Sequence, residues 1–130
     1  MSDKLLWTWF SRFVRLRDSD DFGFCRCITC GRVGHWKEFD CGHGIGRQHK
    51  STKFHEQNNH AQCKKCNGFE EGRKDVYHVE VDRRYGAGTW ERLLTLSRTS
   101  SKRGKFEIEV MTAHYKKQAK DLAKKKGQNI

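Results

Sequence analysis

The sequence contains no proline, no internal repeat and no apolar run of 18 residues. These absences exclude proline-rich linkers, repeat architectures and a membrane-spanning helix, which needs about 20 consecutive apolar residues. Apolar residues make up only 35% of the 130-residue chain, which is too few for a large hydrophobic core. We therefore expect one small domain with short extensions, stabilised by something besides apolar packing.

Acidic residues are also scarce, with 16 Asp and Glu against 27 Lys and Arg, and the net charge is +11. Such an excess predicts a polyanionic partner. Nucleic acid is favoured over a membrane surface, because neither terminus combines a basic face with a broad lipid-binding face. No secretory signal is recognisable, so a reducing, cytoplasmic compartment is expected, where paired cysteines bind metal more often than they form disulfides.

Apolar residues recur at every third or fourth position in four segments, which predicts four helices. These helices are expected at residues 3–17, 67–85, 90–98 and 108–126. Ser2 or Asp3 is expected to cap the first of them. The aromatic stripe of that first helix is apolar enough to serve either the core or a dimer interface, and the sequence leaves both open.

The last predicted helix and the linker before it are strongly basic. Between residues 102 and 126, nine Lys or Arg face three acids, so the local charge is nine minus three, or +6. Two interpretations remain open. The segment is either a solvated amphipathic helix or an arm that neutralises DNA phosphates, in which case binding weakens steeply with salt.

Four of the six cysteines show the spacing of a metal site. They form two Cys-x-x-Cys units, Cys27 with Cys30 and Cys63 with Cys66. Two such turns complete a tetrahedral four-thiolate zinc site, which has no open coordination position and is therefore structural. Cys25 is an alternative ligand with poorer turn geometry, and Cys41 is expected to pack in the core.

Residues suited to phosphodiester hydrolysis lie between and just after these cysteine pairs. His43 stands between Gly42 and Gly44, and imidazole is the side chain whose ordinary pKa makes it a base near neutral pH. Asn58 lies five residues before the second pair, and Asn67 follows it directly. This order resembles the HNN form of the HNH, or ββα-metal, nuclease finger. The resemblance implies that Asn58 braces the loop that carries the base.

Mg²⁺ or Mn²⁺ is the expected catalytic cofactor. The amide oxygen of Asn67 is a hard ligand of the kind that Mg²⁺ prefers. Many HNH fingers place a metal ligand directly before the base, where this sequence has Gly42. Because strand residues two apart share a face, we expect Asp40 to reach into the space at Gly42 and act as the second ligand. A plain hydrogen-bonding role for the Asp40 carboxylate is the alternative.

Longer blocks of the sequence are similar to the NinG family of phage recombination proteins. The matching blocks are VRLRD at 14–18, CITCG at 27–31, DCGH at 40–43, KFHEQNNHAQCKKCNGFEEG at 53–72, and Tyr85-Gly86. The similarity spans roughly residues 5–100. It implies a phage-encoded protein of the host cytoplasm that cuts branched DNA, such as Holliday junctions and D-loops, during recombination. It also implies a homodimer, since symmetrical cutting of a junction needs two active sites.

The expected fold is therefore a small α+β structure, a zinc-stapled ββα-metal finger flanked by helices. We expect an N-terminal helix in 1–24, the nuclease finger and its following helix in 25–86, and a basic helical extension in 87–130. The expected activity is Mg-dependent endonuclease cleavage, with Asp40, His43, Asn58 and Asn67 as catalytic residues. The alternative is a non-catalytic zinc-ribbon module that only binds DNA. The basic residues expected to contact DNA are Arg47, His49, Lys50, Lys53, Arg73, Lys74, Lys102, Arg103 and Lys105.

Overall fold

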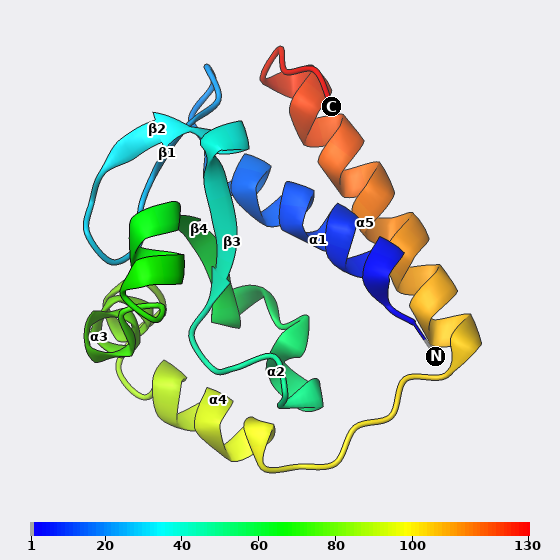
Figure 1. Ribbon diagram of the computed structural model, residues 1–130. Coiled ribbons are helices and arrows are strands. Elements are labelled where there is room, and N and C mark those ends of the chain that lie inside the picture. Colours follow the sequence, from blue (N-terminus) through cyan, green and yellow to red (C-terminus); the bar gives the residue numbers. More distant parts are fainter. Residues whose placement is uncertain (1) are drawn as a thin grey trace.

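The computed structural model describes residues 2–130 as helices packed around two small antiparallel sheets (Figure 1). The α-helices are α1 (Lys4–Arg17), α2 (Lys50–Lys53), α3 (Lys74–Tyr85), α4 (Thr89–Ser97) and α5 (Lys105–Lys125). The strands are β1 (Phe24–Arg26), β2 (Val33–His35), β3 (Phe39–His43) and β4 (Asn59–Cys63). β1 pairs with β2, and β3 pairs with β4. The predicted small α+β class is confirmed.

Helix α1 forms the centre of the larger core, where it lies between the β3–β4 sheet and α5 (Figure 1). Leu6, Phe10 and Val14 are fully buried at the spacing that the sequence predicted. They meet Tyr115 and Ala119 of α5, and the ring centroids of Phe10 and Tyr115 are 4.9 Å apart. The aromatic stripe of α1 therefore serves the core of this chain.

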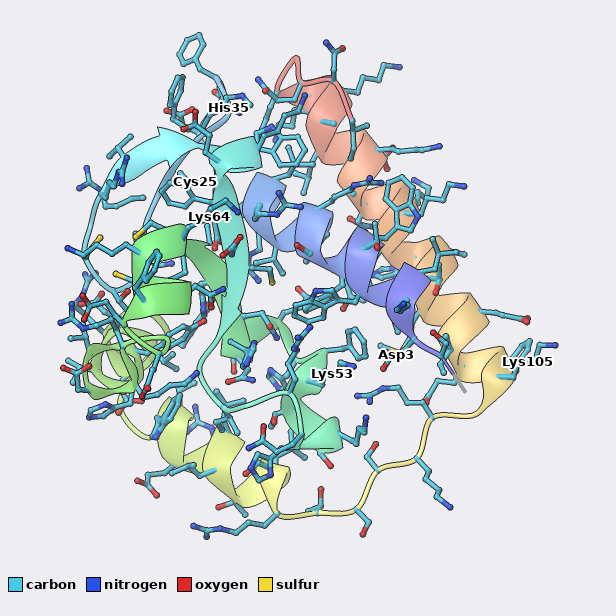
Figure 2. All side chains as sticks on the ribbon, in the orientation of Figure 1. Asp3, Cys25, His35, Lys53, Lys64 and Lys105 are labelled. Atoms are coloured by element: carbon cyan, nitrogen blue, oxygen red, sulfur yellow. The ribbon has the colours of Figure 1, made fainter. Side chains whose placement is uncertain are left out.

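The predicted start of α1 needs one correction. Asp3 precedes the helix but makes no side-chain capping bond; its carboxylate pairs instead with the Lys53 ammonium of α2, at 2.9 Å. Figure 2 shows these two side chains together near the start of α1. The hydroxyl of Ser2 accepts the Lys4 N–H at 3.3 Å. The Asp3 carboxylate thus links α1 to α2 and does not cap α1.

A single helix over 67–85 was expected, and the structure contradicts this. A π-helical turn, Lys65–Phe69, is followed by a break before α3 begins at Lys74. Glu71 and Arg73 adopt left-handed φ angles of 52° and 51°, which an α-helix interior excludes. The buried face of α3 carries Tyr77, which is fully buried, whereas Val79 is 54% exposed.

A smaller core lies under α3 and α4. Tyr77 and Val81 of α3 pack there with Leu93 of α4, and Ile28 and Ile45 join them from the loops that flank the candidate site. Among residues 2–130, no helix has the length and apolarity needed to cross a membrane.

Candidate functional site

The four predicted zinc ligands meet at one point. The Sγ atoms of Cys27, Cys30, Cys63 and Cys66 all lie within 4.8 Å of one another. The Sγ atoms of Cys30 and Cys63 are 3.7 Å apart, close to the edge of about 3.8 Å expected for a tetrahedron with Zn–S bonds of about 2.3 Å. The four cysteines could therefore hold a structural zinc ion.

Hydrogen bonds around this cluster favour the thiolate at Cys27, whereas burial raises the pKa of the Cys63 and Cys66 thiols. The Cys27 sulfur accepts the backbone N–H of Cys63 at 3.3 Å, and the Cys63 sulfur accepts that of Cys66 at 3.5 Å. Although burial raises the pKa of the Cys27 thiol, bonds from the Thr29 hydroxyl and from nearby backbone N–H groups outweigh it and lower that pKa to about 6. Thiolate is the form that binds zinc, so the donor chemistry fits.

The two remaining cysteines lie outside this cluster. Cys25 is buried, and its thiol donates to the Arg15 carbonyl at 3.2 Å. Cys41 packs in the main core beside Asn59. Burial raises the pKa of both thiols to about 12, so both stay protonated and act as small core residues.

His43 ends β3, where the loop that leads to β4 begins, and it pairs there with Asn59 at the start of β4. Its ring lies edge-on to Trp7 of α1 at a centroid distance of 6.5 Å. Its Nδ1 is buried and has no hydrogen-bond partner among residues 2–130. Burial, followed by the charges of Lys74, Arg47 and Lys53, lowers the pKa of His43 to about 4. The imidazole is therefore neutral at physiological pH, with a free nitrogen lone pair.

Asn58 fixes the loop that follows His43. Its Oδ1 accepts the N–H of Ile45 at 2.8 Å, and its Nδ2 donates to the carbonyls of Ile45 and Thr52 at 3.0 and 3.1 Å. Its own carbonyl accepts the N–H of Gly44 at 2.9 Å. The side chain is fully buried, so it acts on the loop and has no access to a substrate.

Asp40 and Asn67 come together on the other side of His43. The Asn67 amide Nδ2 donates to the Asp40 carboxylate at 3.0 Å, which leaves the Asn67 Oδ1 free to accept or to bind a cation. The second oxygen of Asp40 pairs with the Lys64 ammonium at 2.7 Å. Figure 2 labels Lys64, which lies beside β3.

The expectation that Asp40 reaches into the space at Gly42 is wrong. A Cβ atom on Gly42 would lie 2.1 Å from the Oε1 of Gln62, so the Gln62 side chain already fills that space. Gln62 is fully buried and is held by bonds from its Nε2 to Thr29 and to the Gly72 carbonyl. Asp40 shares the face of Gly42, yet its carboxylate turns towards Asn67 and Lys64. Any metal-binding role for Asp40 must be exercised there.

A network of buried polar side chains supports β3 through hydrogen bonds. His60 of β4 is fully buried and lies between two phenols, 3.0 Å from Tyr77 Oη and 2.6 Å from Tyr85 Oη. The Tyr77 hydroxyl donates to the carbonyl of Gly42 at 2.8 Å. Burial lowers the pKa of His60 to about 3, so its ring is neutral and can donate to one phenol while accepting from the other.

One hollow of about 310 Å³ gathers three of the four predicted catalytic residues, Asp40, His43 and Asn67. The predicted phosphate contact Arg47 lines it too, and its guanidinium lies 5.0 Å from the ring centroid of Trp7. Lys64 completes the basic side of the hollow. Arg15 and Lys37 line it as well, so a carboxylate, an amide, an imidazole and four cations face one small space.

Several predicted DNA contacts are already engaged within the chain. Lys53 is paired with Asp3, and its side chain is 12% exposed. Lys74 donates to the His43 carbonyl. Arg73 contacts Asp75 at 3.4 Å. These interactions give the cations structural roles next to the hollow.

The other predicted contacts lie further along the surface. A second hollow of about 1030 Å³ is lined by His49, Lys50, Lys102 and Arg103, and the Arg103 guanidinium donates to the Lys50 carbonyl at 2.9 Å. Lys105 is exposed at the start of α5, at the far edge of the molecule in Figure 2. The predicted basic set is therefore dispersed over several elements.

Sequence reasoning missed three residues of the site. Trp7 was assigned to a core or an interface, Lys64 was read only as part of a zinc turn, and Gln62 received no role. Gly42 was the available signal, because a glycine inside a strand often marks the close approach of another group.

Comparison with known proteins identifies the family. Residues 3–126 match the family described as Bacteriophage Lambda NinG protein. No curated protein and no solved structure matches the chain. Because the match covers nearly the whole chain, the protein belongs to the NinG family.

Proposed function

We propose that this protein is a Mg-dependent, structure-selective DNA endonuclease of the HNH type that acts on branched DNA during phage recombination. The observation that carries the proposal is the single hollow lined by Asp40, His43 and Asn67, held beside a four-cysteine cluster. The order of these residues around the cysteine pairs resembles that of the HNN nuclease finger. A homodimer acting in the host cytoplasm belongs to the same proposal.

His43 is the proposed general base. Its neutral imidazole lines the hollow and supplies the lone pair that takes a proton from the attacking water. Asn58 holds the loop from Ile45 to Thr52 and so fixes the position of that ring. The lowered pKa keeps the base unprotonated, and a nearby DNA phosphate would raise it towards the range of an efficient base.

Asp40 and Asn67 would hold the catalytic Mg²⁺ or Mn²⁺. Both offer hard oxygen atoms, and two protein ligands suit a cation that keeps several of its waters. When bound, the cation stabilises negative charge on the phosphate and the leaving oxygen. Arg47 and Lys64, on the same hollow, would hold the phosphate by charge-assisted hydrogen bonds.

The test compares wild-type protein with His43→Ala and Asn67→Ala on labelled linear, nicked and four-way DNA, with and without Mg²⁺ or Mn²⁺. We expect metal-dependent cutting by the wild type, strongest on four-way DNA. Both variants should still bind DNA and should cut at least about 100-fold more slowly, since general acid–base catalysis contributes about 10²–10⁴-fold.

Two results would contradict this proposal. Retained cleavage by His43→Ala would remove the base from the mechanism. DNA binding without cutting by the wild type under all metal conditions would favour the other class of function, a non-catalytic zinc-ribbon module.

A further inference from the structure

A series of hollows follows α1 across one face of the molecule. In order they have volumes of about 380, 310, 640 and 1030 Å³, and the second is the candidate catalytic hollow. Adjacent hollows share lining residues: Arg15 and Lys37, then Trp7 and Arg47, then Asp3 and Gln48. Neighbouring hollows therefore lie side by side, and we call the row of four the α1 trough.

The α1 trough is strongly cationic. Ten Lys or Arg side chains line it against two aspartates, Asp3 and Asp40, so the balance is ten minus two, or +8. Both aspartates are already paired with lysines, Lys53 and Lys64. A polyanion in the trough would therefore meet cations along its whole length and no free carboxylate side chain.

Trp7 lies where two neighbouring hollows of the trough meet. It lines both the catalytic hollow and the next one, with its ring edge-on to His43 and under the guanidinium of Arg47. An aromatic ring interleaved with cations is typical of proteins that bind single strands, because every base offers a face for stacking. A paired base inside a duplex offers no such face.

We propose that an unpaired DNA strand binds along the α1 trough and passes His43 with a base stacked at Trp7. The inference rests on the proposed function, and it names the feature of the substrate that the site selects. From Asp3 to Arg15 the helix spans roughly 18 Å at about 1.5 Å per residue. At the roughly 3.4 Å rise of a strand in a duplex, that length holds about five nucleotides, and a more extended unpaired strand would place fewer there. The selectivity for branched DNA then comes from strands that have separated next to the catalytic hollow.

The trough is a different surface from most of the basic segment 102–126, for which a DNA-binding arm was one of the two open interpretations. The start of the basic segment, Lys102 and Arg103, lines the last hollow. The rest of that segment lies on α5, where the ammonium groups of Lys116 and Lys120 lie 5.6 and 5.7 Å from the ring centroid of Trp9. None of the later lysines of the segment lines a hollow of the trough. The two surfaces can therefore be tested against each other.

The experiment measures binding of a fluorescein-labelled 12-nucleotide oligo-dT without added Mg²⁺ or Mn²⁺, so that binding is read apart from cleavage. Lys4→Glu/Lys50→Glu changes two exposed residues of the trough, each at a helix start where glutamate is tolerated. The matched control, Lys124→Glu/Lys125→Glu, changes net charge equally at the exposed end of α5. We expect at least about tenfold weaker binding for the trough variant, with a salt slope shallower by about 1.4. The control should stay within about twofold.

A second pair of variants tests the stacking. Trp7→Leu should weaken oligo-dT binding about fivefold or more, since loss of one base–aromatic contact has effects of that size. Trp9→Leu, two residues away on the same helix and outside the trough, should leave binding unchanged. Zinc content and circular dichroism establish that all four variants are folded.

Equal losses in the trough variant and its control would overturn the inference, because overall charge would then explain binding. Blunt duplex bound as tightly as oligo-dT would also overturn it. Failure of wild-type protein to cut any DNA with metal present would instead contradict the proposed function, and the binding comparison would still stand. Failure of wild-type protein to bind any DNA would overturn both.

Discussion

At His43, burial and three neighbouring cations act on the imidazole in the same direction. Each disfavours the charged form, so the pKa falls from its usual value of 6.5 to about 4. The ring is then neutral from roughly pH 5 upwards, and the base form is present throughout the physiological range. Burial is the largest cause of the lowered pKa, and the charges of Lys74, Arg47 and Lys53, which come from three different parts of the chain, add to it.

This placement predicts an unusual titration. NMR of ¹⁵N-histidine-labelled protein should show a His43 midpoint near pH 4, with His43→Ala used to assign the signal. For the same reason, the acid limb of the kcat/KM profile for cleavage should lie below pH 6. The kcat/KM profile reports the protonation of the free protein, in which no DNA phosphate lies near His43. A midpoint near 6.5 would show that the ring is neither buried nor close to the cations.

The residue scale also shows what sequence alone could supply. The identity of His43, Asn58 and Asn67 follows from their order around the cysteine pairs, and the structure places Asn58 where it can brace the loop. The sequence did not show which side chain fills the space beside Gly42, because Gln62 reaches that space from the neighbouring strand. A side chain that crosses between paired strands leaves no periodic signal.

At the scale of elements, the four cysteines join the β1–β2 turn to the turn after β4. The backbone N–H of Ile28 donates to the Ala61 carbonyl at 3.2 Å, so a main-chain bond also joins the β1–β2 turn to β4. Asn67 directly follows the last cysteine, and its position depends on this junction. The zinc site and the candidate catalytic residues are therefore coupled through a few residues of chain.

That coupling predicts different outcomes for two neighbouring substitutions. Cys63→Ser should lose bound zinc and the cooperative thermal transition together, because binding energy in such sites is folding energy. Asn67→Ala should keep both and lose cleavage. Zinc analysis by mass spectrometry and melting followed by circular dichroism make the comparison, with Cys25→Ser as a control for a buried cysteine outside the cluster. Zinc retained at full stoichiometry by Cys63→Ser would contradict the assignment.

At the scale of the whole molecule, local patterns predicted the helices better than their packing. The periodicities of α1 and α5 were read correctly, because both helices carry one apolar stripe. Nothing in either stripe showed that the two helices would pack on each other. The break at 70–73 was missed because its left-handed residues include Glu71 and Arg73, which rarely adopt that conformation. The trough depends on such long-range packing, so it could be found only in three dimensions.

Stability of the whole molecule should depend on pH through His60. Its pKa is about 3 in the folded chain and near 6.5 when unfolded, so between these values the unfolded state binds more protons. Stability from this residue is therefore present above pH 6.5 and is lost as pH falls. From pH 7 to pH 5 the loss in the free energy of unfolding is about 2 kcal/mol.

Urea unfolding of wild-type protein and His60→Phe should be measured at pH 7 and at pH 5. At pH 7 we expect His60→Phe to be less stable than wild type by roughly 2 kcal/mol, because two buried phenols lose their partner.

The same variant should also show the smaller fall between pH 7 and pH 5, since it lacks the titrating ring. His114→Gln, at an exposed position on α5, is the matched control and should keep the wild-type pH dependence. A wild-type slope retained in His60→Phe would mean that other groups carry the acid sensitivity. The Tyr77–His60–Tyr85 chain would then support Gly42 and β3 by hydrogen bonding alone, with no part in how the fold responds to acid.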